Sequence, residues 1–248
     1  MRKNDDQIIL LGRNTVADAL RSDRNITRVI MASDIHRDGR IGEIVDLARK
    51  KSVPVSFIRP QKFEYFDNQG SSQGVAALME KPQNLSIEHI LSTKENPVFF
   101  LFNRLDYEAN LGAILRASWA AGIDAVVCSP NGVSEITPQV SKISQGGAAY
   151  VPLIRKGLLQ VIDVLKRHHI PIVGVEVGQG LPYYQQNLLG PVAFVFGGES
   201  AGFSEQLARQ CDLFIHIPMT PGIASLNVAV TATLVMFEKR RQEATKRS

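Results

Sequence analysis

The C-terminal part of this 248-residue chain carries a series of short apolar runs. They lie at residues 98–102, 125–128, 170–177, 192–196 and 213–217, and segments of helix length separate most of them. Strands that are apolar along their whole length are typical of parallel sheets whose two faces are both covered by helices. We therefore predict an α/β domain with a mostly parallel sheet, closed by a helix that begins near Leu226 and ends in Lys239, Arg240 and Arg241.

The first 80 or so residues show shorter alternating patterns. We predict helices over residues 14–21, capped by Asn14, and over 41–51, with strands over 26–32, 55–58 and 74–78. Residues 81–96 are polar with little periodicity, which indicates a linker that contains a short helix. The expected organisation is a small α/β domain at 1–80, a linker at 81–96 and a larger domain at 97–248.

Charge and cysteine content narrow the class of protein. Lys and Arg number 28 against 24 Asp and Glu, a net charge of +4 that is compatible with a polyanionic partner but does not identify one. Cys128 and Cys211 lie far apart, so neither a disulfide framework nor a zinc site is indicated, and no metal is expected. We find no secretion signal and no membrane span, and we expect a reducing, cytoplasmic location.

Ligands of parallel sheets bind beyond the carboxyl ends of the strands, so the loops there are candidate sites. After 98–102 comes ANLGAILRAS, in which Asn110 is a candidate helix cap and Arg116 follows on the same helix. After 192–196 comes GGESAGFSEQL, with three glycines around Glu199. After 213–217 comes IPMTPGIASLNVAV, where Ser225 could cap the last helix and place the amide of Asn227 in its first turn.

Each of these loops also has a purely structural interpretation, as a capped helix, a tight turn and a second cap. The second loop lacks the spacing G-x-G-x-x-G, and no G-x-x-x-x-G-K-[ST] occurs in the chain. Dinucleotide and nucleoside triphosphate sites are therefore not indicated.

Taken in this order, the three loops resemble motifs of the SpoU (TrmH) family of RNA ribose 2′-O-methyltransferases, in the SPOUT superfamily. The family's N-x-G-x-x-x-R motif matches Asn110, Gly112 and Arg116, and its G-x-E-x-x-G motif matches Gly197, Glu199 and Gly202. Its third motif, I-P-M followed by S-L-N-V, matches residues 217–219 and 225–228, and SKISQGGA at 141–148 resembles a further segment.

The first domain takes part in the resemblance. GRNTVADAL at 12–20 and QGVAA at 73–77 are similar to the start and end of the family's small substrate-binding domain, which is similar to a ribosomal protein. By layout the chain resembles bacterial 23S rRNA guanosine 2′-O-methyltransferases, with tRNA-acting relatives as the alternative. The expected substrate is therefore structured RNA, with rRNA favoured over tRNA.

The resemblance implies methyl transfer from S-adenosylmethionine to a ribose 2′-hydroxyl. It implies that backbone at Gly197, Ile217 and Leu226 holds the cofactor, with Gly198 and Met219 beside it. It also implies that Arg116 is a base or proton-relay partner, with Asn110, Glu199, Ser225 and Asn227 orienting it and the ribose. Because a guanidinium normally stays protonated, binding of the target phosphate is the alternative role for Arg116.

Family members fold the C-terminal domain into a deep trefoil knot and dimerise through it. The resemblance therefore implies a knotted fold and a homodimer in which the helix that carries Arg116 lies near the partner's site. RNA contacts are expected from basic residues of the first domain and from the basic end of the last helix. The first-domain candidates are Arg13, Arg21, Arg24 and Arg28, together with Arg37 and Arg40.

Two alternatives belong to other classes of protein. One is a non-catalytic RNA-binding protein of ribosome assembly with an inactive site, although the polar motif positions are all present. The other is a nucleotide-dependent oxidoreductase, which the missing glycine fingerprint disfavours.

Overall fold

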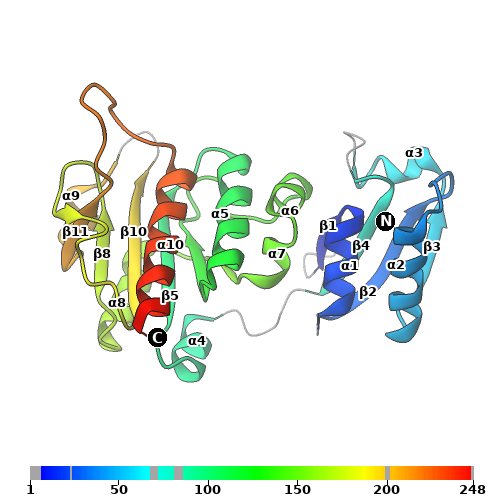
Figure 1. Ribbon diagram of the computed structural model, residues 1–248, viewed down its shortest axis with the longest axis horizontal. Helices are drawn as coiled ribbons and strands as arrows, with labels where there is room; N and C mark the ends of the chain where they lie inside the picture. The colour runs from blue at the N-terminus through cyan, green and yellow to red at the C-terminus, as the bar shows by residue number, and fades with distance from the viewer. Residues whose placement is uncertain (1–6, 23, 68–71, 81–85, 199–201, 247–248) are drawn as a thin grey trace. The chain divides into compact units, whose positions relative to one another are not determined.

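The computed structural model describes residues 7–22, 24–67, 72–80, 86–198 and 202–246. The chain forms two compact units, one made of Met1–Gln83 with Ile136–Tyr150 and the other of Asn84–Glu135 with Val151–Ser248 (Figure 1). The segment Ile136–Tyr150, which the sequence interpretation includes in the C-terminal domain, thus groups with the N-terminal residues. Among the described residues, no helix is both long and apolar enough to cross a membrane.

The first unit contains a four-stranded mixed sheet in the order β1-β4-β2-β3. β4 pairs antiparallel with β1 and β2, whereas β2 and β3 are parallel. The strands are β1 (Gln7–Leu11), β2 (Ile26–Ala32), β3 (Val55–Ile58) and β4 (Val75–Glu80). The helices are α1 (Arg13–Arg21), α2 (Gly39–Lys50), α3 (Pro60–Phe63), α6 (Pro138–Ser144) and α7 (Gly147–Tyr150).

Both faces of this sheet carry apolar side chains, because residues alternate between the faces along each strand. One face packs with the buried residues of α1 and α2, including Val16, Leu20 and Ile44. The other packs with Phe63 and Phe66. The sequence prediction missed β1.

The predicted cap of α1 is wrong. Gly12, which has no side chain to cap the helix, occupies its N-cap position, and Asn14 lies inside the helix. The Asn14 Oδ1 atom instead accepts a hydrogen bond of 2.9 Å from Arg40 Nη2. At α2, Asp38 is the cap and accepts from the backbone N–H groups of Arg40 and Ile41.

The second unit is built on a seven-stranded sheet in the order β7-β6-β5-β10-β8-β11-β9. All of its strand pairs are parallel, as the apolar runs predict. The strands are β5 (Val98–Arg104), β6 (Ala125–Cys128), β7 (Leu153–Arg155), β8 (Ile172–Val175), β9 (Leu181–Pro182), β10 (Val192–Gly198) and β11 (Leu213–His216). The helices are α4 (Ile87–Thr93), α5 (Glu108–Ala121), α8 (Leu158–Arg167), α9 (Glu205–Ala208) and α10 (Val228–Lys246).

Helices cover the sheet of the second unit on both faces. On one face, buried residues of α4, α8 and α9 pack against Phe99 and Leu101 of β5. The strand alternation directs Phe100 to the opposite face, where it lies 4.9 Å from Phe194 of β10 between ring centroids. Figure 1 shows α5 and α10 in front of the sheet, packed side by side.

Helix α10 runs from Val228 to Lys246, so it begins and ends later in the chain than predicted. Lys239, predicted near its exposed end, is buried at 1% exposure, and its Nζ donates to the Gly190 carbonyl at 2.7 Å. The Nζ also pairs with Glu243 at 2.7 Å, so its charge is compensated. The knotted threading implied by the resemblance stays a prediction.

Candidate active site

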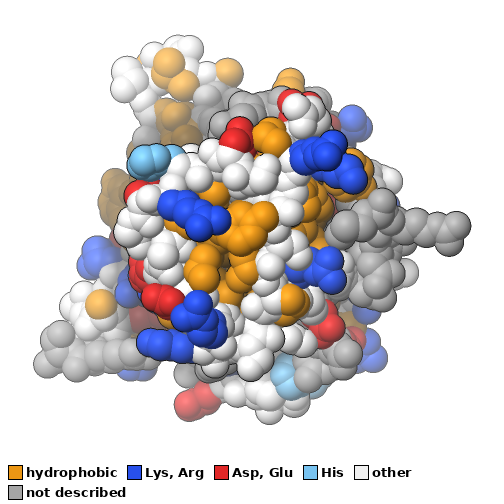
Figure 2. Space-filling view, turned by 90° about the vertical axis from the view of Figure 1, so that its right-hand side faces the viewer, with side chains coloured by type: hydrophobic (Ala, Val, Ile, Leu, Met, Phe, Trp, Pro, Cys, Tyr) orange, Lys and Arg blue, Asp and Glu red, His pale blue; other side chains and the backbone are white. Residues whose placement is uncertain are grey.

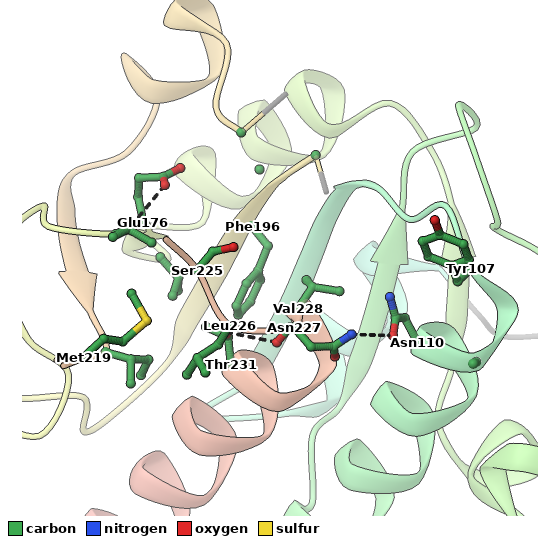
Figure 3. Close-up of a pocket in the computed structure, with 17 residues that line it drawn as sticks. Tyr107, Asn110, Glu176, Phe196, Met219, Ser225, Leu226, Asn227, Val228 and Thr231 are labelled. Atoms are coloured by element: carbon green, nitrogen blue, oxygen red, sulfur yellow. Dashed lines mark hydrogen bonds between the residues drawn. The ribbon is translucent and has the colours of Figure 1, made fainter. Parts of the chain in front are cut away.

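A cavity of about 620 Å³ opens at the carboxyl ends of neighbouring strands of the second unit (Figure 3). The sheet order places β10 between β5 and β8, with β11 next to β8. The segments that follow these four strands therefore meet at one edge of the sheet. The cavity is lined by Tyr107, Ala109, Asn110, Val175, Glu176, Val177, Phe196, Gly197, Gly198, Gly202, Ile217, Met219, Ser225, Leu226, Asn227, Val228 and Thr231.

One wall of the cavity is a glycine turn at the end of β10. Gly198 and Gly202 exchange two backbone hydrogen bonds of 2.8 Å, which brings the strand end close to the returning chain. A Cβ atom on Gly197 would lie 2.4 Å from the backbone carbon of Gly202, closer than atoms can pack. Gly197 is thus required for this close approach rather than for an unusual backbone angle.

A pair of asparagines joins the first and third motifs. Asn227 Nδ2 donates a hydrogen bond of 3.0 Å to Asn110 Oδ1, as Figure 3 shows. Asn227 Oδ1 accepts from the backbone N–H groups of Ala229 at 2.9 Å and Val230 at 3.3 Å. Asn227 therefore caps α10 and links it to α5.

Both helix caps predicted for these motifs are wrong. Tyr107 occupies the N-cap position of α5, and Asn110 lies in the first turn of that helix. Ser225 lies outside α10, and Asn227, predicted inside the first turn, is the residue whose side chain satisfies the N-terminal N–H groups. Serine and asparagine are both good caps, so only the backbone path decides between them.

The structure places most of the predicted site residues around the cavity. The five predicted cofactor ligands all line it, and so do three of the five predicted catalytic residues: Gly197, Gly198, Ile217, Met219 and Leu226, with Asn110, Ser225 and Asn227. Glu199 lies outside the described residues. Arg116 is exposed on α5 and is not among the residues that line the cavity.

Sequence reasoning missed Glu176 and Tyr107, which belong to none of the strings that carry the resemblance. Glu176 directly follows the last residue of β8, and its carboxylate accepts a hydrogen bond of 3.0 Å from the N–H of Val177. The sequence feature that could have identified Glu176 is its position at the end of an apolar strand, where ligands of parallel sheets bind. Among the described lining residues, Glu176 has the only charged side chain.

The basic residues proposed for RNA contact are mostly engaged within the first unit. Arg13 forms an ion pair with Asp38, and Arg21 pairs with Asp18 and Glu43. Arg24 donates to the Tyr150 carbonyl at 3.0 Å and stacks on the ring of the same residue, and burial lowers its pKa. Arg28 is exposed on β2.

Cys128, Cys211 and His216 do not line the cavity. Both cysteines are free, and burial raises the pKa of the Cys128 thiol to about 12 and that of Cys211 to about 11. Nδ1 of His216 lies 3.2 Å from the Gln179 carbonyl oxygen. The part of the chain that the structure describes contains no cluster of His, Cys, Asp and Glu suited to a metal ion.

Comparison with known proteins identifies both parts of the chain. Residues 97–237 match the family model described as the SpoU rRNA Methylase family. Residues 9–85 match the model described as RNA 2′-O ribose methyltransferase substrate binding. A relative from Staphylococcus haemolyticus, whose name assigns it to the TrmH family of tRNA/rRNA methyltransferases, is 29% identical over 242 residues and covers 96% of each chain.

A relative of the same family from Bacillus subtilis is 27% identical over 238 residues, covering 94% of this chain and 95% of the relative. Among solved structures, the SpoU methyltransferase AviRb from Streptomyces viridochromogenes in complex with AdoMet superimposes with a TM-score of 0.84. It covers 97% of this chain and 91% of its own at 20% identity, which shows a shared fold. The chain therefore belongs to the SpoU rRNA methylase family, as an RNA methyltransferase with the fold of the SpoU enzymes.

Proposed function

We propose that this protein transfers a methyl group from S-adenosylmethionine to a ribose 2′-hydroxyl of structured RNA, with 23S rRNA as the expected substrate and tRNA as the alternative. The observation that carries the proposal is the cavity at the sheet edge, where segments of all three sequence motifs meet. Asn110 and Asn227, which lie more than 100 residues apart in the chain, are hydrogen-bonded to each other at this cavity.

The cavity fits such a cofactor in size and in the kind of groups that line it. Its volume of about 620 Å³ lies within the range of small-molecule sites. Gly197, Ile217 and Leu226 line its wall, and the absence of a Cβ atom at Gly197 keeps the glycine turn closed. We propose that the backbone groups of these residues, with Gly198 and Met219, hold the cofactor.

S-adenosylmethionine supplies an electrophilic methyl group on a sulfonium. In the overall transfer a C–O bond forms to the ribose, the C–S bond breaks and its electron pair stays on sulfur, while the hydroxyl proton must leave. The chain's main task is to align the reacting atoms and to stabilise the developing alkoxide. We propose that Asn110 and Asn227 position the ribose, together with Ser225 and Glu199.

We propose that Arg116 binds an RNA phosphate and stabilises the alkoxide, while the phosphate or a water accepts the proton. A guanidinium remains protonated under physiological conditions, so it is suited to binding an anion rather than to removing a proton. Arg116→Ala should abolish methyl transfer while S-adenosylmethionine binding by calorimetry stays at the wild-type level. Near-normal turnover of this variant would exclude the role.

The position of Arg116 supports a homodimer. Its side chain is exposed and does not line the cavity of its own chain. The same pair of packed helices exposes three large apolar side chains, Trp119 on α5 with Val230 and Phe237 on α10. We propose that α5 and α10 pair with the same helices of a second copy and bring Arg116 to the partner's site.

Light scattering should give twice the chain mass of 27.3 kDa. Mixed dimers of the Arg116→Ala chain with a Gly197→Ala chain should regain methyl transfer, because one site then combines an intact cavity with Arg116 from the other copy. A monomer in solution would contradict the homodimer. Mixed dimers without activity would mean that Arg116 serves its own site.

RNA contacts of the first unit are proposed at its exposed basic residues. Of the six arginines predicted from the sequence, Arg28 and Arg37 are best placed. The other four have partners within the unit: Arg13, Arg21, Arg24 and Arg40. The guanidinium of Arg37 stacks over the exposed ring of Phe57 at 5.4 Å, an arrangement suited to unpaired bases and phosphates. Figure 2, viewed from the side where α2 and β3 lie, shows apolar side chains with Lys and Arg around them.

Two measurements test the proposed function. Calorimetry should show that S-adenosylmethionine binds the protein and that NAD does not. Mapping of 2′-O-methyl groups in rRNA and tRNA from cells with and without the gene should reveal one lost site. A cofactor-binding protein with no lost site in either RNA would instead favour the non-catalytic assembly protein.

A further inference from the structure

We infer that Glu176 selects the cationic methyl donor over its neutral product in the proposed cofactor site. This inference rests on the proposed function, since it concerns the ligand of the same cavity. It adds a specificity-determining residue that belongs to none of the three sequence motifs.

The fold places Glu176 between the two segments proposed to hold the cofactor. It follows Val175 of β8, whose neighbours in the sheet are Phe196 of β10 and Ile215 of β11. Phe196 leads directly into Gly197, and Ile215 is two residues before Ile217. The backbone N–H of Glu176 donates to the Ile215 carbonyl at 3.1 Å, which continues the sheet register to the site.

The carboxylate faces the glycine turn. Its Oε2 atom lies 3.7 Å from the position that a Cβ atom on Gly202 would occupy. Figure 3 shows the Glu176 side chain at the cavity, with its one drawn hydrogen bond to the adjacent backbone. The side chain is half-buried and is therefore only partly screened by solvent.

No cation compensates this charge within the described part of the chain. None of the ion pairs found there involves Glu176, and its one side-chain hydrogen bond comes from the neutral N–H of Val177. The other described polar side chains of the lining are neutral: Tyr107, Asn110, Ser225, Asn227 and Thr231. An uncompensated carboxylate in a partly desolvated cavity favours a ligand with positive charge.

The substrate and product forms of the cofactor differ in this property. S-adenosylmethionine carries a sulfonium in addition to its ammonium and carboxylate groups, so its net charge is +1. Loss of the methyl group leaves S-adenosylhomocysteine with a neutral sulfur and no net charge. Glu176 therefore stabilises the bound methyl donor and loses this attraction after transfer, which favours release of the product.

The test compares Glu176→Gln with wild-type protein by calorimetry, using S-adenosylmethionine, S-adenosylhomocysteine and sinefungin, an analogue with an amine in place of the sulfonium. The substitution keeps the size of the side chain and its acceptor for the Val177 N–H. We expect the affinity for the two cationic ligands to fall about tenfold or more, because a unit charge is removed a few ångströms from the ligand. The affinity for S-adenosylhomocysteine should change less than about twofold, since its net charge is zero.

Glu205→Gln is the matched control, because Glu205 is an exposed carboxylate of the same unit that does not line the cavity. Glu176→Asp should retain the preference for the cationic ligands, and thermal unfolding should confirm that all variants are folded. Equal losses for all three ligands would overturn the inference in favour of a hydrogen bond to a group that they share, and unchanged affinities would overturn it outright. If wild-type protein binds none of the ligands, the proposed function itself fails.

Discussion

At the residue scale, Asn227 joins the start of α10 to the side chain of Asn110. Its Oδ1 accepts two backbone hydrogen bonds of the helix, and its Nδ2 donates to Asn110. Asn227→Ala should lower the free energy of unfolding by about 1–2 kcal/mol, the usual cost of a lost N-cap. Urea denaturation measures this difference.

Ser225→Ala is the control for that experiment, since the sequence alone makes Ser225 an equally good cap. Ser225 is exposed and lies before the first residue of α10, so its removal should change the unfolding free energy by less than about 0.5 kcal/mol. If Ser225→Ala lowered the free energy of unfolding more than Asn227→Ala, Ser225 would be the cap. The residue types thus predicted a cap in this segment, whereas the path of the backbone decided which side chain provides it.

At the scale of elements, the end of β10 depends on its close approach to Gly202. A Cβ atom on Gly197 would lie 2.4 Å from the backbone carbon of Gly202 and 2.8 Å from the Phe203 nitrogen. Gly197→Ala must push the two segments apart, so we expect a loss of about 1–3 kcal/mol in unfolding free energy. Calorimetry should show weaker cofactor binding by the same variant.

Gly198→Ala is the matched control, one residue along the strand. Its added Cβ would meet Arg104 Cβ at 3.5 Å and Gly202 O at 3.9 Å, which are ordinary contacts. We expect the free energy of unfolding of Gly198→Ala to differ from the wild-type value by less than about 0.5 kcal/mol. If neither alanine substitution lowered the free energy of unfolding, the turn would not depend on the close contact between Gly197 and Gly202. The motif places three glycines around Glu199, but the sequence did not show which of them makes a close contact or with which residue.

At the scale of the whole molecule, several carboxylates are stabilised in the charged form by the fold. The pKa of Glu43 is lowered by hydrogen bonds from Arg21 and Arg40, and that of Asp38 by the backbone N–H of Ile41 and the nearby Arg13. The pKa of Glu238 in the second unit is lowered mainly by a hydrogen bond from Arg241. These contributions are present above the ordinary pKa of each group and are lost as the pH falls through the lowered value.

The melting temperature should therefore stay constant from pH 7 to about 5 and fall at lower pH. Glu43→Gln should make the fall less steep, because its carboxylate no longer gains protons on unfolding. Glu64→Gln is the control, since Glu64 is exposed and forms no ion pair within the described residues of the same unit. A pH profile unchanged by Glu43→Gln would mean that the network between α1 and α2 does not contribute to acid stability.

Much of the second unit follows from local sequence pattern. Apolar runs without alternation predicted strands of a parallel sheet, and the structure confirms five of its seven strands close to the predicted bounds. The strands β7 and β9 were missed, because they have only three and two residues and show no usable period. In the first unit, β2 and β3 have the predicted bounds because strongly apolar residues end at clear breakers.

The sequence by itself determined the parallel α/β architecture, the family and three of the four segments that line the cavity, because each depends on hydrophobic period, breakers and the order of short motifs. Tertiary structure decided which strands are neighbours, and so brought Glu176, the residue after β8, between segments that the motifs had identified. It also decided that Arg13 and Arg21 are bound in ion pairs and that Arg116 is exposed away from its own cavity. These features depend on contacts between residues distant in the chain, which no local pattern encodes.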